Sequence, residues 1–346
     1  MRTSKPIKLP NDGVILGIES SCDETSAAIL RGSELASVII SSQLFHSEYG
    51  GVIPELASRA HLQAIVPVVE EAMQKASVSK QELTAIAVTH TPGLLGALLV
   101  GTTFAKGLSV SLGIPIVGVH HIEAHIFSAL LEEEKPELPF LALVVSGGHT
   151  LLVLVEDIGK YKILGKTLDD VAGEAFDKVG KMMGLGYPAG PVIDKRAREG
   201  DPAFVQFPRP MLHDASYDFS FSGIKTSVLY HLRDNPEQLQ HNLNDLAASF
   251  QQAIVEVLVA KTIRAAKEYD LRDIVCVGGV SANSQLRHDL SEAAAKHNMR
   301  FLTTRPLLST DNAAMIAMLG GLKLLNGQTD ELSLAAQPRA QLGYGA

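Results

Sequence analysis

Two histidines four positions apart follow an apolar stretch near the middle of the sequence. His121 and His125 lie in residues 119–125, and on a helix their imidazoles would project from one face, one turn apart. This spacing is typical of a two-histidine metal clamp. Glu123 lies between them and would point to the other side, unlike the glutamate of His-Glu-x-x-His metallopeptidases, which follows the first histidine. On spacing alone, surface or capping histidines on an amphipathic helix explain the pattern equally well.

Two segments share the order apolar strand, short polar turn, apolar strand. They are residues 14–30 and residues 140–155, and the second contains the turn Ser146-Gly-Gly-His-Thr150. Backbone N–H groups and hydroxyls in such turns can bind phosphate. Either segment alone is more simply an ordinary hairpin, with glycines suited to turn geometry. Their recurrence, with the Gly278-Gly279 loop after another apolar stretch, favours nucleotide binding.

The composition excludes several classes of protein. The chain has 346 residues, of which 46% are hydrophobic and 20% charged, so a disordered chain is excluded. A net charge of −8 argues against a general nucleic-acid binder, so any RNA contact needs a local basic patch or a partner. Only Cys22 and Cys276 are present, which predicts a reducing compartment and no disulfide scaffold. Residues 1–10 show no signal peptide, and no stretch reaches the roughly 18 apolar residues of a membrane span.

Strand and helix patterns alternate along the chain, which predicts an α/β fold with mixed or parallel sheets covered by helices. Expected strands cover residues 14–18, 26–30, 85–89, 116–119, 140–145, 151–155 and 274–277. Expected helices cover residues 53–73, 94–112 and 244–269, with one after residue 283 and a last one from near Asp311.

A charged segment with two prolines, residues 132–139, suggests a boundary between two lobes. We expect an N-terminal lobe of residues 1–134, carrying the first hairpin and the two histidines. Residues 135–325 are then the second lobe, with the second hairpin and the nucleotide-binding loops. Residues 326–346 are expected to form a tail that returns to the first lobe.

Several motifs, in order along nearly the whole chain, resemble the bacterial TsaD (Gcp/YgjD) family of tRNA N6-adenosine threonylcarbamoyltransferases. The motifs are Glu19-Ser-Ser-Cys-Asp-Glu-Thr25, Tyr49-Gly-Gly-Val-Ile-Pro-Glu-Leu-Ala-Ser-Arg59, Thr91-Pro-Gly-Leu-Leu95, His121-Ile-Glu-Ala-His125, Val144-Val-Ser-Gly-Gly-His-Thr150, Gly173-Glu-Ala-Phe-Asp177, Tyr187-Pro-Ala-Gly-Pro191, Phe219-Ser-Phe-Ser-Gly-Ile-Lys225 and Gly278-Gly-Val-Ser-Ala-Asn283. Ala124 is a departure, because many members have glycine there. Alanine is the better helix former, so the histidine geometry should survive.

The resemblance implies a fold and an activity. The fold is the two-lobed actin/Hsp70/sugar-kinase-like (ASKHA) architecture, with mixed sheets covered by helices. The activity is transfer of the threonylcarbamoyl group from threonylcarbamoyl-AMP to N6 of the adenosine just 3′ of the anticodon. The tRNAs concerned read codons that begin with A, and the product is N6-threonylcarbamoyladenosine.

The resemblance also implies the site residues. The metal ligands are His121, His125 and Asp311, holding one divalent metal per subunit, with iron (Fe2+) favoured over zinc. Without the resemblance, Asp311 would be interpreted as a helix cap. The donor-binding residues are Val144, Val145, Ser146, Gly147, Gly148, Asp177, Gly190, Asp194 and Asn283. Their alternatives are solvated carboxylates for the two aspartates, a plain turn for Gly190 and a helix N-cap for Asn283.

The implied partners are threonylcarbamoyl-AMP, tRNA and the TsaB and TsaE proteins, in the cytoplasm, with a homodimer or a TsaB heterodimer as the assembly. Three other functions remain open: a sugar-kinase-like ATPase, a metalloendopeptidase and a non-catalytic scaffold in an RNA-modifying complex. The kinase is disfavoured because magnesium prefers carboxylates, phosphates and water to paired histidines. The peptidase is disfavoured by the position of Glu123 and the lack of a visible export signal.

Overall fold

The computed structural model describes residues 4–342 and divides the chain into two compact units. Unit 1 contains Pro136–Thr303 together with the N-terminal residues up to Lys5. Unit 2 contains Pro6–Lys135 and the C-terminal part from Thr304 onward. The change of unit after Lys135 falls inside the charged segment noted in the sequence. Residues 304–325 differ from the expected division, because they pack with unit 2 and not with the second lobe.

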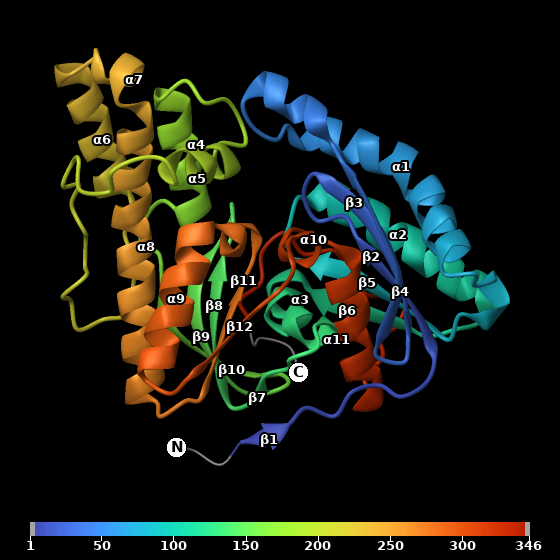
Figure 1. The fold of residues 1–346 in the computed structure, drawn as a ribbon. Coiled ribbons are helices and arrows are strands. Elements are labelled where there is room, and N and C mark those ends of the chain that lie inside the picture. The colour runs from blue at the N-terminus through green and yellow to red at the C-terminus, as the bar shows by residue number, and fades with distance from the viewer. Residues whose placement is uncertain (1–3, 343–346) are drawn as a thin grey trace. The chain divides into compact units, whose positions relative to one another are not determined.

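Unit 2 is built on a five-stranded mixed sheet with the order β4-β3-β2-β5-β6 (Figure 1). The strands β2, β3 and β4 form an antiparallel meander, and β5 and β6 continue parallel to β2. Their bounds are β2 (Val14–Glu19), β3 (Glu24–Arg31), β4 (Glu34–Ser42), β5 (Ala85–Thr91) and β6 (Ile116–His120). The helices are α1 (Pro54–Lys75), α2 (Leu95–Leu112), α3 (His121–Phe127), α10 (Pro306–Ser309) and α11 (Ala313–Leu325), with short 3-10 turns η1 (Leu44–Tyr49), η2 (Lys80–Glu82) and η3 (Ser128–Leu131).

The two faces of the unit 2 sheet are covered by different helices. Leu16 and Ile18 of β2 belong to the cluster that includes Ile65 of α1. Gly17 lies between them and therefore faces the other side, where a Cβ would come within 2.3 Å of the Ala313 carbonyl oxygen of α11. Glycine at this position thus allows α11 to lie directly on the sheet, and this contact brings the C-terminal segment into unit 2.

Unit 1 repeats the same strand arrangement with the order β10-β9-β8-β11-β12. An antiparallel meander of β8, β9 and β10 is again followed by two parallel strands. Its strands are β8 (Phe140–Val145), β9 (Thr150–Asp157), β10 (Lys160–Lys166), β11 (Asp273–Val277) and β12 (Arg300–Thr303), and β1 (Lys5–Pro6) pairs with β7 (Glu137–Leu138). The helices are α4 (Ala172–Met182), α5 (Gly190–Ala197), α6 (Ser222–Asp234), α7 (Gln238–His241), α8 (Leu243–Glu268) and α9 (Ser284–Lys296), with the 3-10 turn η4 (Gly279–Ala282). The predicted α/β fold with mixed sheets is confirmed in both units.

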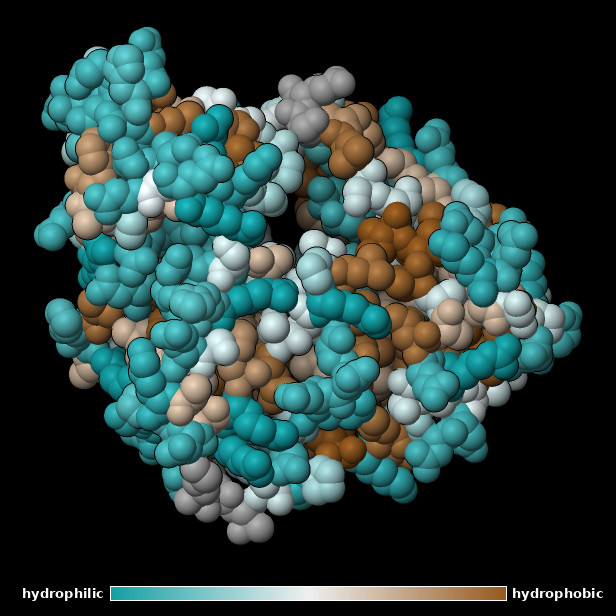
Figure 2. Space-filling model, in the orientation of Figure 1, coloured by the Kyte–Doolittle hydropathy of each residue, from teal (hydrophilic) through white to brown (hydrophobic). Residues whose placement is uncertain are grey.

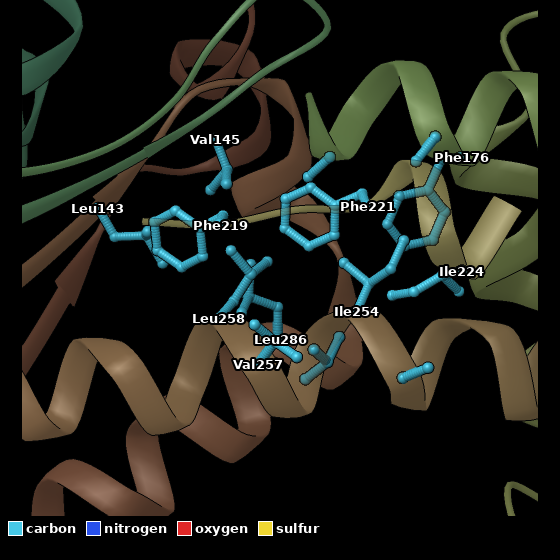
Figure 3. Packing of buried hydrophobic residues seen from close by; sticks show 14 of the residues in the cluster. Leu143, Val145, Phe176, Phe219, Phe221, Ile224, Ile254, Val257, Leu258 and Leu286 are labelled. Atoms are coloured by element: carbon cyan, nitrogen blue, oxygen red, sulfur yellow. The ribbon is translucent and has the colours of Figure 1, made fainter. Parts of the chain in front are cut away.

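The core of unit 1 shows why the motif at residues 219–225 alternates phenylalanine with serine. Phe219 and Phe221 are fully buried, and their rings stack 6.1 Å apart over Ile254 and Leu258 of α8 (Figure 3). In an extended segment alternate residues point to opposite sides, so the intervening serine faces away from the core. The Ser220 and Ser222 hydroxyls donate to Asp169 (2.5 and 2.7 Å). This motif therefore holds α6 onto the core.

Two helices, α2 and α8, are long and apolar enough to cross a membrane by length and composition alone, although the sequence analysis expects no such stretch. The apolar window of α8 is 78% buried inside the structure, which identifies α8 as a core helix. The window of α2 is 33% buried, since only one side of this helix packs on α1 and β5. In Figure 2 hydrophilic residues dominate the region of α6 and α7, whereas hydrophobic residues gather over part of unit 2.

Replacing Phe219 by alanine is expected to destabilise unit 1 by about 3–5 kcal/mol, because the change removes buried apolar area and leaves a cavity. Urea unfolding followed by circular dichroism measures this loss. The matched control is Leu229→Ala in α6, whose side chain is 46% exposed. The control should shift stability by about 0.5 kcal/mol or less. Equal shifts for both variants would contradict the packing role of Phe219.

Candidate functional site

The two histidines are placed by the junction of β6 and α3. β6 ends at His120, whose side chain accepts a hydrogen bond from the Glu123 backbone N–H and so caps α3. His121 and His125 then follow on one helix face, with ring centroids 4.7 Å apart and ring planes nearly perpendicular. Both side chains are buried. The predicted shared face is confirmed, and solvent-exposed surface histidines are excluded.

Asp311 reaches the same point from the loop between α10 and α11. Its Oδ1 lies 3.0 Å from His125 Nε2 and 3.5 Å from His121 Nε2. The three candidate ligand atoms lie within 4.8 Å of one another. The capping interpretation of Asp311 is wrong, because the neighbouring Asn312 caps α11 by accepting from the Met315 N–H. The carboxylate of Asp311 is therefore directed at the imidazoles.

The electrostatics of this cluster favour a positive charge at its centre. Burial alone would raise the pKa of Asp311, but the adjacent His121 and His125 hold it well below its usual value. Burial alone would lower the pKa of His121, yet the carboxylates of Asp311 and Glu19 raise it well above its usual value. Two imidazole nitrogens and a carboxylate are a common donor set for zinc or iron. The chemistry of the donor set and the local field both fit a divalent metal.

Glu19 is a residue of this site that the sequence analysis leaves without a role. Its side chain is fully buried at the end of β2, and its Oε2 lies 3.0 Å from His121 Nδ1. Burial alone would raise the pKa of Glu19, but the charge and hydrogen bond of His121 keep it below the usual value. The only signal in the sequence is an acidic residue at the end of an apolar strand, which does not name its partner.

Further acidic residues surround the cluster. Burial, with the nearby charges of Asp311 and Asp23, raises the pKa of Glu24 to about 9 in the metal-free protein. Burial and the same acidic neighbours also raise the pKa of the Cys22 thiol. Cys22 is not one of the three candidate ligands. Glu123 lies 3.8 Å from Lys323 and outside the candidate ligand set, as expected from its position between the histidines.

The turn between β8 and β9 in unit 1 carries the first candidate donor-binding residues. Val144 and Val145 are fully buried strand residues, so they position the turn and do not line an open surface. Ser146 closes the turn: its N–H donates to the His149 carbonyl (2.8 Å), and its Oγ accepts from the His149 N–H (3.0 Å). Gly147 and Gly148 are exposed, and a Cβ on either would meet nothing within 4 Å.

The glycines of this turn differ from the glycine that packs beneath it. A Cβ on Gly173 would come within 2.6 Å of the Ser146 carbonyl oxygen, so packing requires glycine there. Gly147, Gly148 and Gly190 have open space around them, and none has a left-handed φ. Neither packing nor backbone strain thus explains these three glycines. Gly107 in α2 has the same two properties, so open space at these glycines leaves room for a ligand without assigning one.

Asp177 and Asp194 are held by their own loops. Asp177 Oδ1 accepts from the Ala189 N–H (2.8 Å), which fixes the loop that contains Gly190, and burial raises the Asp177 pKa. Asp194 Oδ1 accepts from the N–H and hydroxyl of Ser284, and its Oδ2 accepts from Arg198. Neither side chain is a plain solvated carboxylate. Asp194 also supplies an anion at the N-terminus of α9, where the helix dipole favours one.

Asn283 is the N-cap of α9. Its Oδ1 accepts from the Leu286 N–H (3.0 Å), and its Nδ2 donates to Gln251 Oε1 (2.6 Å). The capping alternative for Asn283 is thus what the structure shows. Both ends of the amide are occupied, so a contact of this side chain with adenine or ribose stays a prediction.

Sequence and structure comparisons identify the relatives of this chain. Residues 34–318 match the model of the TsaD family, tRNA N6-adenosine threonylcarbamoyltransferase. A protein of that name from Syntrophotalea carbinolica is 51% identical over 337 residues, covering 96% of this chain and 98% of the relative. One from Chloroherpeton thalassium is 54% identical over 326 residues, covering 90% and 93%.

Two solved structures share the fold at low sequence identity. HypF from T. kodakarensis has a TM-score of 0.62 at 14% identity, covering 93% of this chain and 49% of that chain. Component A of (R)-2-hydroxyglutaryl-CoA dehydratase from Acidaminococcus fermentans has a TM-score of 0.55 at 14% identity, covering 91% and 100%. These likenesses show the fold alone. The match to the family model and the near-complete relatives show that the chain belongs to the TsaD family of tRNA N6-adenosine threonylcarbamoyltransferases.

Proposed function

We propose that this chain transfers the threonylcarbamoyl group from threonylcarbamoyl-AMP to N6 of the adenosine just 3′ of the anticodon, in tRNAs reading codons that begin with A. The observation that carries the proposal is the family match over residues 34–318, which includes the cluster of His121, His125 and Asp311. The exocyclic amine of adenine is a weak nucleophile. The site must therefore activate the donor carbonyl and stabilise the departing AMP.

We further propose that His121, His125 and Asp311 hold one divalent metal, with Fe2+ as the first candidate and Zn2+ as the second. Their ligand atoms converge within 4.8 Å, and three protein ligands leave positions open for substrate oxygens. A bound metal would act as a Lewis acid and template for the donor. The protein side chains contribute the orientation of the ligands and a field that favours a cation.

In unit 1 we propose that the donor's adenylate binds at the Ser146–Gly148 turn and the Gly190 loop. Open backbone at Gly147, Gly148 and Gly190 supports this assignment. The residues expected to contact ribose or adenine are Asp177, Asp194 and Asn283, which are already anchored to their loops. These hydrogen bonds hold the side chains in place, so that their free oxygen lone pairs are already oriented to accept hydrogen bonds from a ligand.

The direct test is transfer from threonylcarbamoyl-AMP to unmodified tRNA, followed by nucleoside mass spectrometry. The purified chain with its partners and metal should produce N6-threonylcarbamoyladenosine. Hydrolysis of ATP without tRNA modification would favour the kinase-like alternative. Binding of partners without turnover would favour a scaffold.

The partners proposed for the reaction are TsaB and TsaE, with tRNA as substrate and the cytoplasm as location. An apolar groove between α1 and α2 supports docking of a protein partner, which we take to be TsaB. Its members Leu62 and Leu99 are 65% and 48% exposed, and Val66 is 48% exposed. Adjoining exposed apolar side chains of this kind typically mark an interaction surface.

Removing one imidazole, by His121→Ala or His125→Ala, should abolish both the binding of one metal per chain and threonylcarbamoyl transfer. The fold should be retained. Loss of one of three ligands should weaken metal binding by orders of magnitude. Elemental analysis, circular dichroism and the transfer assay measure the three properties. The control is His288→Ala, whose side chain is 66% exposed in α9. Full metal content with normal turnover in either cluster variant would refute the metal assignment.

Adding a methyl group by Gly148→Ala should weaken binding of an AMP-based donor analogue without unfolding the protein. The Cβ has open space in the free protein, so its clash would be with the ligand. Overpacking of this kind costs about 1–3 kcal/mol, or at least about fivefold in affinity by calorimetry. Gly107→Ala in α2 also has open space and is the matched control. Unchanged affinity for Gly148→Ala would place the adenylate elsewhere.

Charge placed in the α1–α2 groove should prevent association with TsaB. When the double variant Leu62→Glu with Leu99→Glu is mixed with TsaB, the two proteins should sediment separately in analytical ultracentrifugation. Association would bury two carboxylates in an apolar contact. Leu332→Glu, at a side chain 51% exposed in the C-terminal segment, is the control and should still associate. Association of the double variant at wild-type affinity would exclude this surface as the docking site.

A further inference from the structure

A carboxylate lies behind His121, on the side of the ring away from Asp311. His121 Nε2 is 3.5 Å from Asp311 Oδ1, whereas Nδ1 is 3.0 Å from Glu19 Oε2. The Ser21 hydroxyl is a longer neighbour of Nδ1, at 3.3 Å. Glu19 is fully buried and is not one of the three candidate ligands. Its contact with the cluster therefore passes through the imidazole of His121.

Glu19 is held from both sides of its carboxylate. The Ser21 backbone N–H donates to Oε1 (2.6 Å), and the Thr89 hydroxyl donates to Oε2 (2.7 Å). With the Nδ1–H of His121 as a third donor, the buried charge has the hydrogen bonds that it needs. Thr89 belongs to β5, which pairs directly with β2. The sheet itself thus fixes the position of this carboxylate.

The segment after Glu19 is also immobilised. The Ser20 hydroxyl donates to the Ala97 carbonyl (2.9 Å), and the Leu94 N–H donates to the Ser21 carbonyl (2.8 Å). A Cβ on Gly101 would come within 2.3 Å of Ser20 Oγ, and one on Gly93 within 2.5 Å of the Ser21 carbonyl oxygen. These contacts fix the backbone that follows Glu19, and the Ser21 N–H and Thr89 hydroxyl fix its carboxylate. The imidazole must therefore adapt to Glu19.

We propose that Glu19 is a positioning residue that fixes the tautomer and ring orientation of His121 for metal binding. An acceptor at Nδ1 requires the proton on that nitrogen, which leaves the Nε2 lone pair directed at the position shared with His125 and Asp311. This inference rests on the metal site proposed above. It adds a residue from β2 to a site whose ligands come from α3 and the α10–α11 loop.

The second histidine lacks this support. His125 Nδ1 is buried and has no hydrogen-bond partner among residues 4–342. His125 is instead placed by its helix and by its Nε2 contact with Asp311. His121 is therefore the ligand whose orientation is set before a metal arrives. The carboxylate behind it should matter for affinity although it never touches the metal.

The substitution Glu19→Gln tests this role with little change in volume. If the amide oxygen accepts from the Ser21 N–H, the amide NH2 faces His121 Nδ1. Nδ1 must then accept a hydrogen bond, so the neutral imidazole carries its proton on Nε2. If the oxygen faces His121, the NH2 opposes the Ser21 N–H. Either arrangement disfavours the metal-binding tautomer. Loss of such a supporting carboxylate typically weakens metal affinity about 10–100-fold.

The first measurement is Zn2+ affinity of the full chain by chelator competition, with thermal unfolding of the metal-free protein alongside. The second is nitrogen NMR of histidine-labelled, zinc-loaded protein, in which the His121 Nδ1–H signal should be slow to exchange in the wild type and lost or shifted in Glu19→Gln. Thr25→Val is the matched control. Its hydroxyl makes a buried contact with His61 (2.7 Å) beside the same hairpin but outside the cluster.

The expected result is a 10–100-fold loss of Zn2+ affinity for Glu19→Gln and none for Thr25→Val. If Glu19→Gln does not fold, Thr89→Val removes one support of the carboxylate and should weaken Zn2+ binding in the same direction. Zn2+ affinity within twofold of wild type and an unchanged Nδ1–H signal would overturn the positioning role alone. Failure of the wild type to bind Zn2+ or Fe2+ would overturn the metal site and this inference together.

Discussion

The chain of contacts from Glu19 through His121 to Asp311 is the constraint on which the candidate metal site of unit 2 depends. A buried carboxylate is tolerated only when it is paired and fully hydrogen-bonded. The three residues of this chain of contacts come from β2, from α3 and from the loop before α11. Their contacts therefore link three parts of the chain that are distant in sequence. Asp311 reaches this cluster because the packing of α11 on the sheet, which Gly17 allows, returns the C-terminal segment to unit 2.

The sheet supplies the common point at which these residues meet. β2, β5 and β6 are parallel, so their carboxyl ends lie at one edge. Glu19 ends β2, Thr89 lies near the end of β5, and His121 follows the last residue of β6. Parallel order therefore converts three strand ends far apart in sequence into one polar cluster. This placement agrees with the general rule that ligands bind beyond the carboxyl ends of parallel strands.

The sequence predicted what depends on local periodicity and missed what depends on tertiary partners. The four-residue spacing of the histidines was sufficient to place both rings on one face. Local sequence could not decide whether Asp311 or Asn312 caps α11, because both residue types cap helices. Only the folded structure shows that Asn312 is the cap. The role of Glu19 depends on a histidine 102 positions away. β4 was missed because it is an edge strand in which only Ser37 and Ile39 are buried, so its apolar pattern is weak.

In unit 1 the motifs that resemble the family contain two kinds of residue: some build the loops, and others leave space beside them. Phe219 and Phe221 fill the core, and Asp194 and Asn283 anchor the start of α9. Gly147 and Gly148 have neither packing nor backbone strain to explain them. If a nucleotide binds here, its phosphate must therefore be recognised chiefly by backbone groups, with the side chains holding that backbone in place. Backbone recognition is insensitive to side-chain rotamers, so rigidity of the loops becomes the property that the surrounding aspartates and phenylalanines must supply.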